Sequence, residues 1–225
     1  MNEITLNDLS IDCVIFGFEG DLKILLVRHK AGISQGKWAL PGGFVLSNES
    51  LDDAASRILQ ALTGIHDIFL EQTKAFGAVN RFPTKRVVTI AYQALLSIEK
   101  SPLVPGFTAD DARWFSLAEV STLPYDHNEI LSYTLDRLRK KIRQEPIGFN
   151  MLPQKFTLFQ LQKLYESILN ISLDKPNFRR KIAKMKLLVD TGEKQNDVSY
   201  RAAKLYRFDE DVYDSLKEKK FILDF

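Results

Sequence analysis

Three carboxylates lie close together in the chain, at Glu49, Asp52 and Asp53. Carboxylate oxygens are the ligands that Mg²⁺ prefers, and a bound Mg²⁺ could activate water to attack a phosphate. The same three residues stand at the start of a helix predicted for 50–62, where negative charge interacts favourably with the helix dipole. Two interpretations are therefore open: a metal-dependent hydrolase that uses these carboxylates, and a helix start without chemistry.

The second chemically informative stretch is 175–186, which contains six basic residues and no acidic one. Phe178, Ile182 and Met185 recur at helical spacing, which predicts a helix that buries one face. Arginine can form two hydrogen bonds with a guanine, asparagine can form two with an adenine, and lysine neutralises phosphates. A solvated basic face is the alternative. The residues predicted to contact DNA, including two from the segment that follows the helix, are Lys175, Asn177, Arg179, Arg180, Lys181, Lys184, Lys194 and Arg201.

The N-terminal part alternates between strands and helices. Strands are predicted at 13–18, 22–27, 87–98 and 112–115. The turn signal Glu19-Gly20-Asp21 between the first two predicts a hairpin. Apolar residues at helical spacing predict the helix of 50–62. A capping box of Asp126 and Glu129 predicts a later helix that extends to about residue 143.

The composition changes at 145–153, where two prolines and a glycine in nine residues predict a linker. A capping box at Thr157 and Gln160 then begins an apolar helix, and Asp174 caps the basic helix. A polar, turn-rich segment at 190–197 and a strand at 199–208 follow. This order of elements is that of a winged helix-turn-helix. We therefore predict two domains, at 1–148 and 153–225.

The N-terminal part resembles the Nudix hydrolase superfamily from Trp38-Ala39-Leu40-Pro41-Gly42-Gly43 onward. The box of that superfamily is matched at Gly43, Glu49, Arg57, Leu59, Gly64 and Ile65. The resemblance covers about residues 10–145 and implies an α/β/α sandwich with a mixed sheet. The glutamates that hold the catalytic metal in working members are replaced by Ile58, Ala61 and Leu62. Because these side chains offer no oxygen ligand, we expect no catalytic residues, no metal, no cofactor and no enzyme activity.

The chain as a whole is similar to the Nudix-related transcriptional regulators of bacteria, in which such a domain is joined to a winged helix. The matching stretches are Asn177-Phe178-Arg179-Arg180-Lys181 and Lys204-Leu205-Tyr206-Arg207-Phe208. The resemblance implies an α+β homodimer that binds double-stranded operator DNA as a repressor or activator of NAD-synthesis or sugar-utilisation genes. It also implies a small-molecule effector, either an ADP-ribose-type nucleotide or a pentose or related sugar.

Polar and aromatic residues on the pocket side of the Nudix-like fold could bind such an effector. Arginine suits a phosphate, aspartate suits sugar hydroxyls, and tryptophan suits the face of an adenine or a sugar. Each of them also has a structural interpretation as core, helix cap or solvated surface. The predicted effector-binding residues are Arg28, Lys37, Trp38, Phe44, Arg81, Arg86, Asp126 and His127, with Lys85 and Tyr125 beside them.

Composition narrows the class of protein. Hydrophobic residues make up 45% of the chain and charged residues 27%, as in soluble globular proteins. No run approaches the roughly 20 apolar residues of a membrane span, and the start of the chain lacks the pattern of a signal peptide. We therefore expect a cytoplasmic protein without membrane contact. The single Cys13 excludes an internal disulfide and a cysteine zinc site.

The distribution of charge is asymmetric along the chain. Sixteen basic and 18 acidic residues precede residue 150, whereas 15 basic and 11 acidic residues follow it. A basic C-terminal part is expected where that part meets nucleic acid. An RNA-binding module is a third hypothesis, but the aromatic residues lie at core spacing and form no stacking platform of the kind that single-strand readers use.

Overall fold

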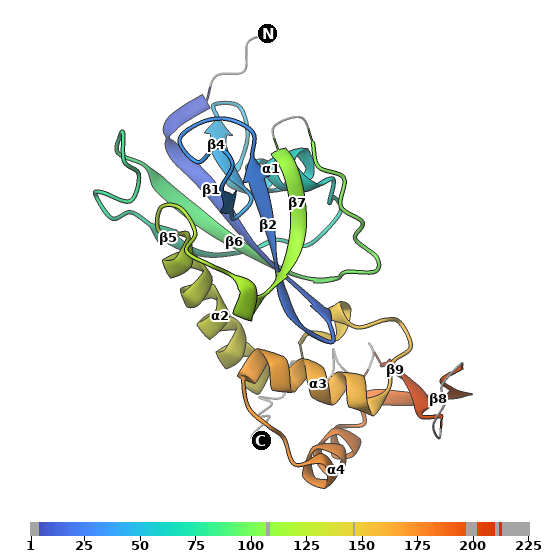
Figure 1. The fold of residues 1–225 in the computed structure, drawn as a ribbon. Helices are drawn as coiled ribbons and strands as arrows, with labels where there is room; N and C mark the ends of the chain where they lie inside the picture. The colour runs from blue at the N-terminus through green and yellow to red at the C-terminus, as the bar shows by residue number, and fades with distance from the viewer. Residues whose placement is uncertain (1–4, 107–108, 146, 197–201, 210–211, 213–225) are drawn as a thin grey trace. The chain divides into compact units, whose positions relative to one another are not determined.

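The computed structural model describes residues 5–106, 109–145, 147–196, 202–209 and 212 (Figure 1). The chain divides into two compact units, one of Met1–Gly17 with Lys23–Thr134 and one of Phe18–Leu22 with Leu135–Phe225. Helices and strands occur in both units, so the predicted α+β class is confirmed. Among the described residues, no helix has the length and apolar character needed to cross a membrane.

The N-terminal unit is built on a sheet that has seven strands within the described residues. The strands are β1 (Thr5–Glu19), β2 (Asp21–His29), β3 (Trp38–Ala39), β4 (Gly42–Leu46), β5 (Glu71–Phe76), β6 (Val88–Ser97) and β7 (Ala109–Ser116). The main path is β3-β2-β1-β6-β5, while β4 pairs with β1 and β7 with β2. The predicted hairpin turns at Gly20, whose φ of 78° suits glycine. Strands β3 and β4 are too short to show an apolar pattern in the sequence, and the edge strand β5 is too polar to show one.

Helix α1 (Leu51–Thr63) packs on this sheet as its apolar spacing predicts. It begins at Ser50, whose hydroxyl accepts a hydrogen bond from the backbone N–H of Asp53 at 3.1 Å. It ends at Gly64 in the left-handed conformation. The side chains that α1 adds to a core shared with β1, β2, β6 and β7 are Ala54, Ala55, Ile58, Leu59 and Leu62.

Helix α2 (His127–Gln144) contributes to both units, because the division falls between Thr134 and Leu135. It begins directly after Asp126, as predicted, and both carboxylate oxygens of Asp126 accept hydrogen bonds from Arg81. In the second half of α2, Leu138 and Ile142 are buried. The Nε of Arg139 donates to the carbonyl of Ile168 at 2.9 Å. The second half of α2 therefore belongs to the core of the C-terminal unit.

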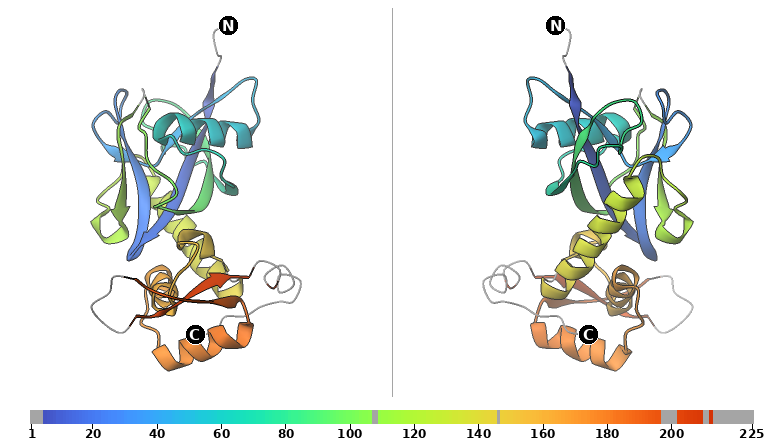
Figure 2. Two further views of the ribbon diagram at one scale, coloured as in Figure 1. Left: turned by 90° about the vertical axis from the view of Figure 1, so that its right-hand side faces the viewer. Right: turned by 90° about the vertical axis from the view of Figure 1, so that its left-hand side faces the viewer.

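The C-terminal unit contains α3 (Leu158–Leu169), α4 (Lys175–Met185) and a hairpin of β8 (Leu188–Lys194) and β9 (Lys204–Phe208). Figures 1 and 2 show α3 and α4 running crosswise, next to the hairpin. The capping box of Thr157 and Gln160 is confirmed. Asp174 caps α4 as predicted, since its Oδ1 accepts from the backbone N–H of Asn177 at 2.9 Å.

Two expectations for the C-terminal part are wrong. The segment 145–153 is not an exposed linker, because Phe149, Met151 and Leu152 are buried and the Phe149 ring stacks on Phe208 with centroids 4.1 Å apart. The segment from residue 190 is not a loop, since β8 extends to Lys194 and pairs with β9. Backbone hydrogen bonds form this hairpin, and an exposed, polar strand gives no apolar alternation by which to find it.

Replacing Ile142 by alanine is expected to lower the free energy of unfolding of the C-terminal unit by roughly 3 kcal/mol, because the change leaves a cavity in its core. Ile142 is 0% exposed. Arg143 is exposed in the same turn, so Arg143→Ala should change stability by no more than about 0.5 kcal/mol. Thermal unfolding followed by circular dichroism compares the two variants. Equal Tm values would contradict the placement of this half of α2.

Candidate functional site

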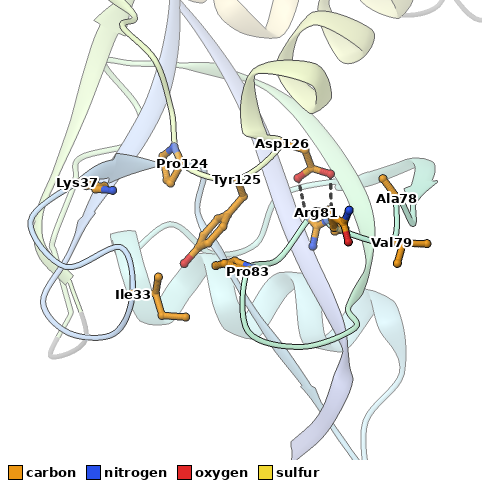
Figure 3. Close-up of a pocket in the computed structure, with 10 residues that line it drawn as sticks. Ile33, Lys37, Ala78, Val79, Arg81, Pro83, Pro124, Tyr125 and Asp126 are labelled. Carbon is orange, nitrogen blue, oxygen red and sulfur yellow. Dashed lines mark hydrogen bonds and ion pairs between the residues drawn. The ribbon is translucent and has the colours of Figure 1, made fainter.

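A cavity of about 630 Å³ opens in the N-terminal unit, where three loops meet (Figure 3). The loop between β2 and β3 contributes Ile33 and Lys37. The loop between β5 and β6 contributes residues 78–81 and Pro83, and the loop before α2 contributes residues 124–126. The lining is mixed, with prolines and aliphatic side chains beside a lysine, an arginine and an aspartate. A small molecule with both apolar and hydrogen-bonding parts fits such a lining.

Three predicted effector-binding residues line this cavity, namely Lys37, Arg81 and Asp126. Tyr125, named beside them, also lines it. No sequence pattern pointed to Ile33, Asn80, Pro83 or Pro124 as cavity residues. These residues lie in irregular loops, where apolar periodicity gives no signal, and only the folded chain brings them together.

Arg81 is buried in an ionic network at the cavity. Its Nε donates to Oδ2 of Asp126 at 2.8 Å and its Nη2 to Oδ1 of the same carboxylate at 2.7 Å. Nη2 also donates to Oδ2 of Asp12 at 3.2 Å. Figure 3 shows the Arg81 guanidinium directed at Asp126. Only 3% of the Arg81 side chain is exposed. Its hydrogen bonds to these two carboxylates already occupy much of its hydrogen-bonding capacity.

His127 joins the same network from the start of α2. Its Nδ1 accepts a hydrogen bond from the backbone N–H of Leu40 at 3.1 Å. Its Nε2 lies 3.4 Å from Oδ1 of Asp12. Burial raises the pKa of Asp12, but His127 and Arg81 together lower it below its usual value. His127 is 4% exposed and does not line the cavity, so its position is that of a buried support.

The other predicted effector-binding residues also lie outside the cavity lining. Trp38 packs edge-on against Phe115 with centroids 4.8 Å apart, and the guanidinium of Arg28 lies 5.7 Å from its ring. Phe44 has the Nζ of Lys85 over its ring at 4.2 Å. Arg86 is exposed, and its Nη1 donates to the carbonyl of Ala78 at 2.9 Å. Their effector contacts remain predictions.

The cavity also contains a strained aromatic residue. Tyr125 has a φ of 56°, a conformation that is uncommon for a bulky side chain. Its ring stacks on Phe82 with centroids 4.9 Å apart and meets the His127 ring at 5.4 Å. Strained residues concentrate where a ligand is clamped, which makes Tyr125 a further effector contact to test.

Apolar side chains occupy the positions of the missing Nudix glutamates. Ile58 and Leu62 are 3% and 5% exposed and belong to the core between α1 and the sheet, whereas Ala61 is exposed. A β-carbon on Gly43 would lie only 3.3 Å from the Ile58 side chain. Glutamates at 58 and 62 would therefore have to displace core packing.

The three carboxylates near the start of α1 have separate partners. Both oxygens of Glu49 accept from Arg57, at 2.6 and 2.7 Å, and these bonds lower the pKa of Glu49. Asp52 accepts from the hydroxyl of Tyr92 at 2.6 Å, and Asp53 accepts from that of Ser50 at 2.7 Å. Across the part of the chain that the structure describes, no three His, Cys, Asp or Glu side chains are grouped to hold a metal ion.

Helix α4 presents a basic surface in the C-terminal unit. Phe178 and Ile182 are buried and Met185 is half-buried, which confirms the predicted apolar face. The exposed basic residues of the helix are Lys175, Arg179, Arg180 and Lys184, while Asn177 and Lys181 are half-buried. Because Lys175–Met185 contains no acidic residue, nothing within the helix opposes the approach of a phosphate backbone.

The hairpin that follows α4 is less basic than its sequence suggests. Lys194 is exposed at the end of β8. Lys204 is paired with Asp190 at 2.7 Å, and Glu193 of β8 is paired with Lys155 at 2.6 Å. Arg201 lies outside the described residues. Helix α4 therefore presents more exposed positive charge than the described part of the hairpin.

Comparisons with known proteins match both units. The family described as NUDIX domain matches residues 6–138, and the family described as NrtR DNA-binding winged helix domain matches residues 148–208. The ADPR responsive transcriptional repressor NtrR of Acinetobacter baylyi is 33% identical over 211 residues, which are 92% of this chain and 84% of that repressor. The chain belongs to the NrtR family of Nudix-related transcriptional regulators.

Solved structures of NrtR relatives share this architecture. Shewanella oneidensis NrtR complexed with a 27mer DNA is 30% identical, with a TM-score of 0.78 over 92% of this chain and 95% of that one. The NUDIX domain of the same protein complexed with ADP ribose is 29% identical, with a TM-score of 0.55 over 61% of this chain and 90% of that domain. The predicted fold, a Nudix-type domain followed by a winged helix, is therefore confirmed for this NrtR-family chain.

Proposed function

We propose that this NrtR-family protein is a ligand-responsive repressor that binds operator DNA through α4. The observation that carries the proposal is the exposed basic face of α4, opposite the buried Phe178 and Ile182. A helix of this kind can enter the major groove with arginine at base edges and lysine at phosphates. Since palindromic operators are read by two-fold dimers, we further propose that two copies bind together.

The effector is proposed to bind in the cavity of the N-terminal unit. Relatives named for ADP-ribose make this nucleotide the first compound to test. Of the three charged residues in the lining, Arg81 and Asp126 pair with each other, which leaves Lys37 to meet a phosphate. A free sugar would instead use the polar groups of the lining and the backbone. Both effector classes therefore belong in the same titration.

We also propose that the Nudix-type domain binds its ligand without hydrolysing it. The support is the apolar character of positions 58, 61 and 62 together with the separate partners of Glu49, Asp52 and Asp53. A metal-dependent hydrolase remains the second candidate, because these carboxylates lie within a Nudix-type domain. Incubation of the protein and Mg²⁺ with ADP-ribose separates the two: release of AMP at catalytic rates would support the hydrolase.

The first experiment is a mobility shift with the DNA upstream of the protein's own gene. ADP-ribose, nucleotide sugars, free pentoses and free hexoses are titrated into the complex. A shift that one of these compounds reverses or strengthens would support the proposal and name the effector class. Absence of binding at every salt concentration would contradict the DNA-binding function and reopen the hydrolase and RNA-binding alternatives.

Arg180→Ala is expected to weaken operator binding by roughly 5- to 150-fold, as loss of about 1–3 kcal/mol at a base contact implies. The helix should stay folded, since Arg180 is exposed. Lys100 is exposed in the N-terminal unit, so Lys100→Ala removes one positive charge from outside the C-terminal unit and should leave affinity nearly unchanged. Fluorescence anisotropy measures both variants. Equal affinities for the two would place the DNA-binding surface elsewhere.

A further inference from the structure

Asn177 and Arg180 lie one turn apart on α4 and form a hydrogen bond with each other. The Nη2 of Arg180 donates to Oδ1 of Asn177 at 2.8 Å. Asn177 is itself anchored, because its backbone N–H donates to the capping carboxylate of Asp174 at 2.9 Å. The guanidinium is thus held by a residue in the first, capped turn of the helix.

The helix geometry gives the two side chains different positions relative to the buried face. Successive residues of an α-helix are about 100° apart. Arg180 therefore points nearly opposite the centre of the face formed by Phe178 and Ile182, whereas Asn177 lies on its flank. The burial agrees, since Arg180 is exposed and Asn177 is half-buried. When α4 enters a groove, Arg180 is the side chain that faces the base edges most directly.

The hydrogen bond also affects which base each side chain can read. Arginine has five N–H donors in a fork that fits O6 and N7 of guanine. One donor is directed at Asn177, and the rest of the fork can reach a base. Asparagine reads adenine by accepting from N6 with its oxygen while donating to N7. In α4 that oxygen accepts from Arg180, so the guanidinium competes with adenine for it.

We propose that Asn177 is a positioning residue that directs the Arg180 guanidinium to a guanine of the operator, and that it does not read an adenine itself. The inference rests on the proposed DNA-binding function and adds which base is read and by which side chain. Holding a long side chain before binding reduces the conformational entropy lost when it contacts DNA. Asn177 therefore acts on base preference through Arg180.

The test measures binding to the operator and to a set of duplexes in which each base pair is changed in turn. Arg180→Ala should lose a preference for guanine at one position by roughly 5- to 150-fold. Asn177→Ala should lose preference at the same position. The affinity of the double variant should lie within about twofold of the affinity of Arg180→Ala, because the two residues act as one unit. Circular dichroism checks that every variant is folded.

Asn177→Asp provides a conservative rescue. A carboxylate keeps an acceptor oxygen for Arg180, and a negative charge near a helix N-terminus is tolerated. Its charge should weaken binding to all duplexes alike, because it repels phosphates. The preference for guanine, which is a ratio between duplexes, should nevertheless stay within about threefold of the wild type.

Two results would overturn the inference while leaving the DNA-binding function intact. In the first, Asn177→Ala loses a preference for adenine at one position, and the affinity losses of the two single variants multiply in the double variant. The other is an unchanged preference for guanine in Asn177→Ala. A wild-type protein that binds no DNA at any salt concentration would overturn the proposed function, and the inference with it.

Discussion

Ile58→Glu is expected to lower the free energy of unfolding of the N-terminal unit by about 4 kcal/mol or more at pH 7, because it forces a carboxylate into the core. Ile58 is 3% exposed and packs against Gly43. Full burial raises the pKa of a carboxyl group by up to about 3–5 units, and each unit corresponds to about 1.4 kcal/mol. Restoring this glutamate of the Nudix box should therefore damage the fold.

The pH dependence of this variant follows from the raised pKa. Below the unfolded-state pKa of about 4, the new carboxyl is protonated in both states and carries no charge penalty. As the pH rises above that value, the unfolded state ionises first, so the destabilisation should grow up to the raised pKa of the folded state. Urea unfolding at several pH values measures this trend.

Ala61→Glu is the matched control for the same motif. Position 61 lies on the same helix but is exposed, so its carboxylate stays in water and stability should change by no more than about 0.5 kcal/mol. Equal urea midpoints for the two variants at pH 7 would contradict the buried position of residue 58. The pair therefore separates the effect of burial from the effect of an added negative charge.

Arg81→Ala is expected to destabilise the N-terminal unit by about 3–5 kcal/mol, the cost of removing one partner from a buried ion pair. Arg81 donates to both Asp12 and Asp126, and only 8% and 12% of those side chains are exposed. Without the guanidinium, two carboxylates remain together in a poorly solvated site. Arg86→Ala, in the same loop, removes an exposed arginine and serves as the control.

The effect of Arg81→Ala should depend on pH. In the wild type the pKa of Asp12 is lowered, so its stabilising contribution is complete above the unfolded value near 4 and is lost as the pH falls below it. The deficit of Arg81→Ala should accordingly be largest near pH 7 and shrink toward pH 4, where Asp12 can take up a proton. A deficit that is constant with pH, or that matches Arg86→Ala, would show that the network does not stabilise the fold.

Local patterns predicted the helices and the exposed basic face of α4. Capping residues such as Thr157 and Asp174 act on their own turn, so the chain alone reveals where α3 and α4 begin. The buried stripe of Phe178 and Ile182 follows from helical spacing in the same way. The loss of the Nudix glutamates is also a property of residue types, and it could be read before any fold was known.

Tertiary structure decided what depends on distant partners. Asp126 looks like a helix cap in the chain, yet its carboxylate binds Arg81, 45 residues away, because a buried guanidinium requires a countercharge. The segment 145–153 looks like a linker, yet its apolar side chains complete a core with Phe208. The cavity likewise exists only where three loops meet. Sequence periodicity shows which residues of a helix or strand face the core. The partners that those residues contact are set by the packing of segments far apart in the chain.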